Sequence, residues 1–546
     1  MTQHTGPTDR PELIFALVGA AGTRLDDLSR ALKDALSTFG YEAVDIRLSD
    51  LLVNFTGWSD QKGLSEFDRI RHLQDMGDEL RRSLKDGAAL ALAGIAEIRA
   101  RRSSFSGSPD RPASARAYIV RQLKHPHEVD LFRRVYGSSF LLVAGHAPWE
   151  LRAAELAKRM ARKESRPGEE SHFKPHAYTV MEIDEKHNDD FGQNTRDTYP
   201  KSDFFANLGI DRGEYEVHRF VDLLFGHPFG TPSPEEYAMY QAHVSLRSSD
   251  DSRQVGAVIV SLTRNPKDKD RITNADIIAV GMNEVPRGGG GFYWDKDSPD
   301  NRDQWLLRYR GEDRAKEIKI SALAELIEMI RIKGWFRDSI PAGRASEFAR
   351  DLVNDLKRTQ FMDIGEFSRI VHAEMAALID GARRGVAVNG HTMYVTTFPC
   401  HNCAKHIIAA GIRKVVFLEP YSKSRAGHLH QEEINLESVD GKEEEGRVVF
   451  FSFSGIGPRQ YQQVFSMSER GAKKGSSLKD WEACRRSLSP RYVMQNAEVA
   501  YLFGECKELE KLPTDIYRWN RETICPSAKA QNGGNDTKLQ ISAEDK

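Results

Sequence analysis

Four residues in two short segments constrain this chain more than any other feature. They are His372 and Glu374 in the first segment and Cys400 and Cys403 in the second, with 27 residues between His372 and Cys400. The pattern predicts a helix that begins at His372, a strand at residues 391–398, and a second helix that begins at Cys400. Both cysteines then lie in the first turn of a helix, where exposed N–H groups and the helix dipole favour the thiolate form.

These side chains suit a zinc ion. Two thiolates and one neutral imidazole, from Cys400, Cys403 and His372, offset the charge of Zn²⁺ and leave its fourth position for water. Three protein ligands with one open position are typical of a catalytic site, whereas a structural site has a fourth ligand. Two other interpretations stay open. The cysteines could form a redox pair, or a structural zinc could be completed by His401 or His406.

The composition limits the class of protein. A length of 546 residues predicts two to four domains. The 78 Lys and Arg residues against 80 Asp and Glu residues give a net charge of -2, without the basic excess usual in proteins that coat a nucleic acid. Five cysteines, an odd number, do not match a secreted disulfide framework. We find no signal peptide and no apolar run of about 18 residues, so we expect a cytoplasmic protein that does not enter a membrane.

The N-terminal part of the chain alternates strand-like and helix-like segments. Strands are predicted at Leu13–Ala20, Tyr41–Leu52 and Ser139–Ala147, with helical patterns between them. This alternation favours an α/β domain with a mostly parallel sheet at residues 12–230. Residues 161–176 are charged, poor in apolar side chains and interrupted by proline and glycine, which predicts a mobile excursion.

A second domain is predicted at residues 231–515, where a segment rich in proline and glycine precedes a helix and two strand candidates. Residues 288–362 form an insertion with helical periodicity, and the βαβ pattern resumes after it. Residues 1–11 and 526–546 are polar, and we expect both ends to be disordered.

Three segments give the second domain a resemblance to a known family. Residues 236–288, the segment FSRIVHAEMAAL and the segment TTFPCHNCAKHIIAAGIRKVVFLEPYSKS resemble the deoxycytidylate deaminase family. The combination of His-x-Glu with Pro-Cys-x-x-Cys matches the signature of zinc nucleobase deaminases. The resemblance covers roughly residues 234–460, apart from the insertion. It implies a cytidine-deaminase fold, a three-layer α/β/α arrangement around a five-stranded mixed sheet.

The resemblance also implies roles for individual residues. Glu374 is expected to take the proton from the attacking water, pass it to the ring nitrogen N3 of cytosine, and protonate the leaving ammonia. Asn283 matches the position at which the family's asparagine hydrogen-bonds the sugar or base, and a plain turn asparagine is the alternative. Arg253, Arg287 and Lys423 are candidates for contacts with substrate phosphates, with a salt bridge or a surface position as the alternative.

The long form of the chain resembles a narrower group, the bacterial antiphage dCTP deaminases, which join such a domain to an N-terminal P-loop kinase-like domain. Gly19, Gly22, Thr23 and Arg24 would then form a nucleotide-binding loop. A working phosphate loop ends in Gly-Lys-Ser or Gly-Lys-Thr, and this loop does not. We therefore expect a degenerate P-loop domain that transfers no phosphoryl group.

This narrower resemblance implies zinc-dependent deamination of dCTP to dUTP, and of dCMP to dUMP, by a homo-oligomer. It further implies depletion of dCTP during phage replication, with the enzyme held inactive beforehand by an RNA or protein partner. Two alternatives stay open: a housekeeping dCMP deaminase that supplies dUMP for thymidylate synthesis, and a deaminase that edits nucleic acid. The balanced charge counts against the editing enzyme, because a polymer substrate usually needs a basic approach surface.

Overall fold

The computed structural model describes residues 10–59, 61–185, 190–209, 213–245, 254–294, 297, 300–311, 314–335, 341, 343–356, 367–420, 424–436, 442–466, 478–491 and 497–526. The chain divides into two compact units. The first unit comprises residues 1–240, 416–422 and 434–546, and the second comprises residues 241–415 and 423–433. Of the two ends that we expected to be disordered, only Arg10, Pro11 and Pro526 fall among the described residues.

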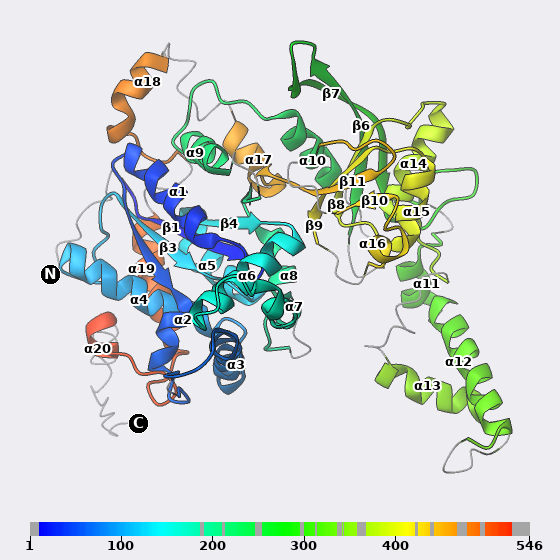
Figure 1. Ribbon diagram of the computed structural model, residues 1–546, viewed down its shortest axis with the longest axis horizontal. Coiled ribbons are helices and arrows are strands. Elements are labelled where there is room, and N and C mark those ends of the chain that lie inside the picture. The colour runs from blue at the N-terminus through cyan, green and yellow to red at the C-terminus, as the bar shows by residue number, and fades with distance from the viewer. Residues whose placement is uncertain are drawn as a thin grey trace, which may run out of the picture. The chain divides into compact units, whose positions relative to one another are not determined.

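The first unit contains a sheet of six strands in the order β12-β5-β4-β1-β3-β2 (Figure 1). The strands are β1 (Leu13–Gly19), β2 (Glu42–Arg47), β3 (Arg116–Arg121), β4 (Phe140–His146), β5 (Phe204–Asn207) and β12 (Gly455–Ile456). β12 runs antiparallel to β5, and all other neighbours in the sheet are parallel. The strands predicted at Leu13–Ala20 and Ser139–Ala147 are confirmed as β1 and β4, and the mostly parallel sheet is confirmed. The strand predicted at Tyr41–Leu52 is confirmed only over β2, because Leu48–Leu51 form a short helix.

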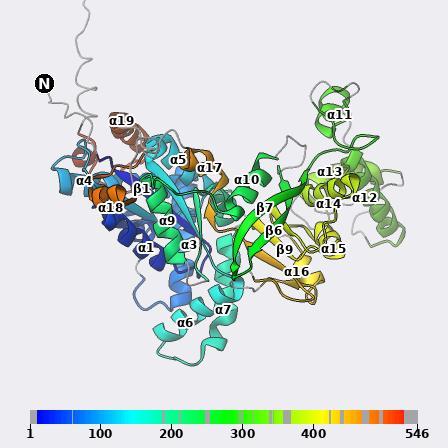
Figure 2. The same ribbon diagram turned by 90° about the horizontal axis from the view of Figure 1, so that it is seen from above.

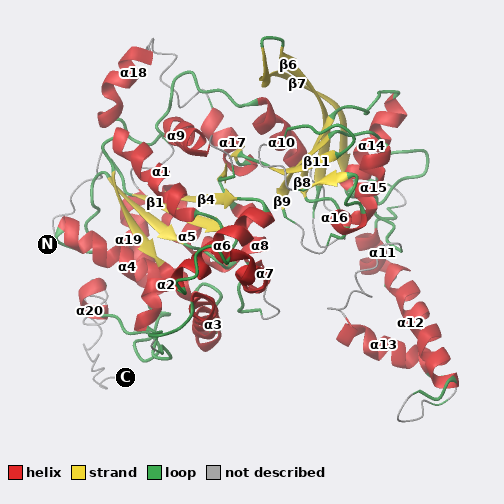
Figure 3. Ribbon diagram, in the orientation of Figure 1, coloured by secondary structure: helices red, strands yellow, loops and turns green. Residues whose placement is uncertain are grey.

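Helices cover both faces of this sheet (Figure 3). Phe15 and Leu17 of β1 belong to one core cluster with residues of α1 (Leu25–Thr38) and α9 (Gly213–Leu224). On the other face, Val120 of β3 lies beside Gly94 of α4 (Ala89–Ser106). Every residue of β1 is buried, as expected for a parallel strand with helices on both sides.

Other helices of this unit connect and flank the strands. They are α2 (Leu48–Leu51), α3 (Glu66–Leu84), α5 (Pro126–Tyr136), α8 (Thr195–Thr198), α17 (Pro458–Phe465), α18 (Leu478–Cys484), α19 (Ala497–Leu509) and α20 (Arg521–Ile524). Helix α10 (Pro234–Val244) is the helix predicted after the segment rich in proline and glycine, and it crosses the division between the units.

Helices α6 (Trp149–Lys163) and α7 (Glu170–Glu185) form a helical hairpin in the first unit (Figure 2). Its core contains Ala157 of α6 and Phe173 of α7, both buried, and Ala21 of the loop after β1 packs against that core. The prediction of a mobile excursion at residues 161–176 is wrong. Its charged stretch occupies the exposed turn between the helices, while the apolar side chains along both helices pack together in a buried core.

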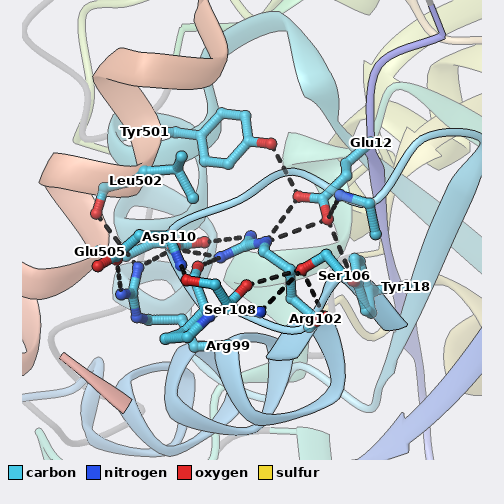
Figure 4. Close-up of polar contacts among 12 residues, drawn as sticks. Glu12, Arg99, Arg102, Ser106, Ser108, Asp110, Tyr118, Tyr501, Leu502 and Glu505 are labelled. Carbon is cyan, nitrogen blue, oxygen red and sulfur yellow. Dashed lines mark hydrogen bonds and ion pairs between the residues drawn. The ribbon is translucent and has the colours of Figure 1, made fainter. Parts of the chain in front are cut away.

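A buried ionic network joins the C-terminal helix α19 to the N-terminal elements (Figure 4). Arg102 of α4 donates hydrogen bonds to both carboxylate oxygens of Glu12, at 2.9 and 3.0 Å, and to both of Glu505, at 2.7 Å. Tyr501 donates to Glu12 at 2.8 Å, and Arg99 donates to Glu505 at 2.7 Å. Removing one member of a buried charged network is costly because its partners stay buried without compensation.

This network explains a difference from the expected domain boundaries. We expected residues 231–515 to form the second domain, whereas residues 434–546 belong to the first compact unit. The same assignment follows from β12, which pairs with β5 in the first sheet.

The second sheet has the order β10-β11-β9-β8-β6-β7. Its strands are β6 (Gly256–Asn265), β7 (Asp268–Met282), β8 (Thr392–Thr397), β9 (Lys414–Glu419), β10 (Ile434–Asn435) and β11 (Val448–Ser452). β6 is antiparallel to both β7 and β8, and β10 is parallel to β11. A mixed sheet was expected, and it has six strands where the resemblance implied five.

The described residues of the second unit also include helices. They are α11 (Asp303–Arg310), α12 (Arg314–Ile332), α13 (Ala345–Asp355), α14 (Ala373–Arg384) and α15 (His401–Ala409), with the short α16 (Ala426–Leu429) after β9. The predicted helical insertion corresponds to α11, α12 and α13, of which α12 and α13 share a small apolar core. Among the described residues, no helix is both long and apolar enough to span a membrane.

Candidate functional site

The first segment of the site is placed by a close approach between β7 and α14. A Cβ atom on Gly281 would lie 2.0 Å from the carbonyl oxygen of Ala373 and 2.3 Å from the amide nitrogen of Ala377, so only glycine permits this contact. His372 is the N-cap residue of α14. A two-way backbone bridge between Glu284 and Val371, at 3.1 and 3.3 Å, fixes the chain just before it.

The second segment is placed by the junction between β8 and α15. All six residues of β8 are buried, and Cys400 is the N-cap residue of α15. Cys403 lies in the first turn and is fully buried. Ser424 donates a hydrogen bond of 2.8 Å to the carbonyl oxygen of Pro399 and so holds the loop before Cys400. The predicted helix–strand–helix arrangement is confirmed.

The two segments bring three metal-ligating side chains together. His372 Nδ1 lies 3.4 Å from Cys400 Sγ and 3.3 Å from Cys403 Sγ, and all three ligand atoms lie within 4.8 Å of one another. Zinc bonds of about 2.1 Å to nitrogen and 2.3 Å to sulfur at tetrahedral angles place ligand atoms about 3.6 Å apart, so the set fits zinc. Within the described part of the chain, no other group of three or more such side chains meets this spacing.

The electrostatics of the cysteines agree with metal binding. A hydrogen bond from Cys403, followed by the hydrogen bond and charge of His372, lowers the pKa of Cys400 to about 4. The hydrogen bond with Cys400 and burial raise the pKa of Cys403. The pair thus holds one thiolate and one thiol in the absence of metal, and a divalent cation would displace the remaining proton.

Glu374 stands beside the ligand set without belonging to it. It is buried in the first turn of α14, with 4 % of its surface exposed. Burial, followed by the charge of the Cys400 thiolate, raises the pKa of Glu374 to about 7. A carboxyl group with a pKa near the working pH can both accept and donate a proton, which is what a general acid–base catalyst requires.

Asn283 lies close to the start of α14, because the next residue, Glu284, forms the backbone bridge with Val371. Asn283 is buried, and its Oδ1 accepts a hydrogen bond of 2.7 Å from the amide of Val255. A substrate contact would therefore use Nδ2. Glu284, also buried, was not singled out from the sequence, because nothing in its spacing relates it to the zinc ligands.

The three candidate phosphate contacts are not brought to the zinc ligands by any described interaction. Arg287 is exposed on a turn, and its Nη1 lies 3.4 Å from Asp297 Oδ1, as in the salt-bridge alternative. Arg253 and Lys423 lie outside the described residues.

The loop after β1 packs closely against helices α6 and α7. Gly22 has a φ of 87°, and a Cβ atom there would lie 2.5 Å from the backbone carbonyl oxygen of Arg152 on α6. The amide of Ala21 donates a hydrogen bond of 2.8 Å to Asp184 Oδ2 of α7. Asp184 also forms an ion pair with Lys124 and accepts a hydrogen bond of 3.4 Å from Thr195.

The four residues predicted for this loop have different surroundings. Gly19 ends β1, and its carbonyl oxygen accepts hydrogen bonds from Gln122 at 2.5 Å and Lys124 at 3.3 Å. Thr23 closes a turn onto the carbonyl oxygen of Ala20 at 3.0 Å. The side chain of Arg24 is 58 % exposed and pairs with Asp27 at 3.4 Å, so it does not reach into the loop.

Comparison with known proteins relates the zinc ligands to one family. Residues 232–419 match the cytidine and deoxycytidylate deaminase zinc-binding region. The match includes His372, Glu374, Cys400 and Cys403, and it does not extend to the strands that precede it.

Individual relatives share a shorter segment. The chain is 47% identical over 57 residues to the deoxycytidylate deaminase of Enterobacteria phage T2, 10% of this chain and 30% of the relative. It is 44% identical over 54 residues to ComE operon protein 2 of Bacillus subtilis, and 42% identical over 53 residues to the deoxycytidylate deaminase of Homo sapiens. These alignments cover 10% of this chain and 29% of each of those two relatives. The chain thus spans under a third of the length of these relatives.

Among solved structures, the dCMP deaminase of cyanophage S-TIM5 aligns over 41% of this chain and 100% of its own length. The sequence identity is 17% and the TM-score 0.20. At that TM-score the alignment adds nothing to what the residues and the family match establish.

Proposed function

We propose that this protein, which carries at residues 232–419 a zinc domain of the cytidine and deoxycytidylate deaminase family, hydrolytically deaminates deoxycytidine nucleotides. The reactions are dCTP to dUTP and dCMP to dUMP, each with release of ammonia. The observation that carries the proposal is the buried carboxyl of Glu374, with a pKa raised to about 7, beside His372, Cys400 and Cys403. A structural zinc would need no such group.

When bound by these three residues, zinc lowers the pKa of a water molecule and so supplies a nucleophile near neutral pH. Glu374 accepts the proton of that water and delivers it to ring nitrogen N3, which makes C4 of cytosine open to attack. The Glu374 carboxylate then takes the second proton, from the new hydroxyl group on C4, and passes it to the departing amino group, so that ammonia leaves and the C4 carbonyl forms. Burial of Glu374 keeps the transferred proton from exchanging with bulk solvent.

Asn283 is proposed to orient the substrate. Its Oδ1 is held by Val255 at 2.7 Å, which would fix the amide plane and direct Nδ2 toward the sugar or base. Arg253, Arg287 and Lys423 stay candidates for the phosphates.

Free nucleotides are favoured over a nucleic acid because the chain has a net charge of -2 and polymer substrates usually require a basic surface. The test is to incubate purified protein with dCTP, dCMP and cytosine-containing single strands and to measure uracil products. Glu374→Gln protein is the control. Deamination of the strands alone would favour the editing alternative, and no product from any substrate would contradict the proposal.

The purpose that we propose is depletion of dCTP during phage replication, by a homo-oligomer that an RNA or protein partner holds inactive beforehand. More than 200 residues precede the zinc domain, and a helical insertion interrupts it, which favours control over a minimal catalytic domain. Bacteria that express the protein should lose dCTP after infection. Level dCTP with normal phage growth would favour the housekeeping alternative, with dCMP as substrate.

The N-terminal unit is proposed to regulate without hydrolysing ATP. Its loop lacks the Gly-Lys-Ser or Gly-Lys-Thr ending, and the Ala21 amide is already bound by Asp184. Steady ATP hydrolysis by the purified protein, absent in Asp184→Ala protein, would contradict this.

A further inference from the structure

A cavity of about 80 Å³ lies at the carboxyl ends of β1 and β4 in the first unit. Gly19 at the end of β1 pairs with Gly145 of β4. In the sheet, β2 and β3 lie on one side of β1, and β4, which follows them in the chain, lies on the other side. The strand order therefore reverses at β1. Ligands of open parallel sheets bind at such switch points, outside the carboxyl ends of the strands.

In the loop after β1, the amide of Ala21 is bound by Asp184 and is not open to a ligand. Polar side chains around the cavity are the candidates for holding one. Those that line it come from well-separated parts of the unit, among them Thr23, His146, Arg152, Arg196 and Tyr199.

Two of these side chains carry buried hydroxyl groups without a hydrogen bond of normal geometry. Tyr199 is 5 % exposed, and its hydroxyl interacts with Ser452 on the cavity wall outside normal hydrogen-bond geometry. The hydroxyl of Thr23 is buried and has no hydrogen-bond partner in the structure. Burial raises the pKa of Tyr199, so its hydroxyl stays a neutral donor. A buried hydroxyl without a partner is unfavourable, and a ligand oxygen in the cavity would remove that penalty.

The charges that line the cavity favour an anion. Arg152 and Arg196 contribute two guanidinium groups to the lining, against one carboxylate from Glu185, and Nε of Arg196 also pairs with Asp197 at 3.2 Å. Arg152 is held in place by its hydrogen bonds to the carbonyl oxygens of Ala147, at 3.1 Å, and Ala21, at 3.3 Å. Arginine forks bind phosphoryl and carboxyl oxygens with matched geometry.

The other walls are apolar and include Ala20, Phe417 and Pro420. Burial, followed by the nearby charge of Arg152, lowers the pKa of His146 to about 3, so the imidazole is neutral at physiological pH. An apolar lining with a few convergent polar groups is typical of sites for small molecules.

We propose that this cavity binds a small organic anion, with one phosphoryl or carboxyl group on a flat apolar body. The oxyanion lies between Arg152 and Arg196 and accepts hydrogen bonds from the hydroxyls of Thr23 and Tyr199. The flat body lies against Phe417 and Pro420. This site is separate from the zinc ligands and does not depend on the proposed activity.

The test uses zinc-loaded, full-length protein and four small probes in isothermal titration calorimetry. Phenyl phosphate and benzoate carry the same flat body with different oxyanions, and phenol and inorganic phosphate are the two halves of phenyl phosphate. At least one of the two complete probes should bind with one site per chain and a dissociation constant in the low millimolar range or tighter, as fragments of this size reach. Each half should bind at least about 10-fold more weakly.

Variants locate the binding. Tyr199→Phe removes one hydroxyl and should weaken the bound probe about 10-fold, since it loses a hydrogen bond to a charged group. Tyr136→Phe is the matched control, because it removes another buried hydroxyl of the same unit that lies outside normal hydrogen-bond geometry and does not line the cavity. Arg196→Gln should weaken binding at least as much as Tyr199→Phe. Glu374→Gln should bind the probe like the unmodified protein, which separates this site from the zinc centre.

Three results would overturn the proposal. They are no saturable binding of either complete probe, equal binding by Tyr199→Phe and unmodified protein, and loss of binding in Glu374→Gln protein. If Arg196→Gln does not fold, Tyr199→Phe with its control decides the question alone.

Discussion

Two junctions of this protein lead from a buried strand into a helix, and they use the helix start in opposite ways. At the junction of β8 and α15, Cys400 and Cys403 point with His372 toward a common centre, and metal binding would displace the one proton that remains on the cysteine pair. At the junction of β1 and α1, the amide of Ala21 already donates to Asp184, a carboxylate from the protein's own hairpin.

The difference shows that a helix start is a binding site only where the chain leaves its polar groups for a ligand. Asp184 accepts a hydrogen bond from the Ala21 amide in the loop after β1, and the ion pair with Lys124 balances the charge of Asp184. The predictions below test each side of this contrast.

The largest expected effect is loss of the metal. Cys400→Ala and Cys403→Ser each remove one of the three zinc ligands. Among the described residues, no other metal-ligating side chain belongs to this group and could replace the lost ligand. Both variants should lose zinc and deamination together, measured by elemental analysis and by chromatography of the products. Cys484→Ser, at an exposed cysteine, should retain both. Full zinc content in Cys403→Ser protein would contradict the ligand assignment.

The next effect separates chemistry from metal binding. Glu374→Gln keeps the size of the side chain and removes its ability to carry a proton, so turnover should fall by about 10²- to 10⁴-fold. Zinc should stay near one per chain, because Glu374 is not a ligand. Retained activity would rule out the proposed proton transfers, and loss of zinc would mean that Glu374 supports the ligands as well.

The sequence predicted the zinc centre more completely than the other junction, for a physical reason. The chemistry of His372, Cys400 and Cys403 follows from residue type, and one helix–strand–helix unit brings them together. By contrast, Lys124 and Asp184 are 60 residues apart in the chain, and only the packing of the α6–α7 hairpin joins them.

The same limit applies to the domain boundary and the hairpin. Arg102 and Glu505 are 403 residues apart, and no local pattern could predict that α19 returns to the first unit. The hairpin was missed because residues 161–176 are charged, while most apolar positions that hold the two helices together, such as Leu156 and Val180, lie outside that stretch.

A smaller effect concerns the stability of the occupied loop. Asp184→Asn leaves Lys124 buried without its counter-charge, which should lower the free energy of unfolding by about 3–5 kcal/mol. Asp27→Asn breaks the exposed pair with Arg24 and should lower it by no more than about 1 kcal/mol. Urea unfolding of the two variants measures the contrast.

A double variant sharpens the same test. Lys124→Met combined with Asp184→Leu removes both charges, and it should recover most of the stability lost in Asp184→Asn protein. If Asp184→Asn unfolds at the same urea concentration as Asp27→Asn, then Asp184 does not hold the loop closed.

The smallest effect is a dependence of stability on pH that comes from His146. Its pKa is lowered from 6.5 to about 3 by burial and by Arg152, so between these values the unfolded chain binds a proton that the folded protein does not. Stability from this group is therefore complete above pH 6.5 and falls as the pH drops toward 3. His146→Gln protein lacks this loss of stability at low pH. Between pH 7 and pH 4, the melting temperature of the unmodified protein should therefore fall by more than that of the variant. His172→Gln, at an exposed histidine of the same unit, should show no such shift, and an equal shift in both variants would mean that His146 is not kept neutral by its surroundings.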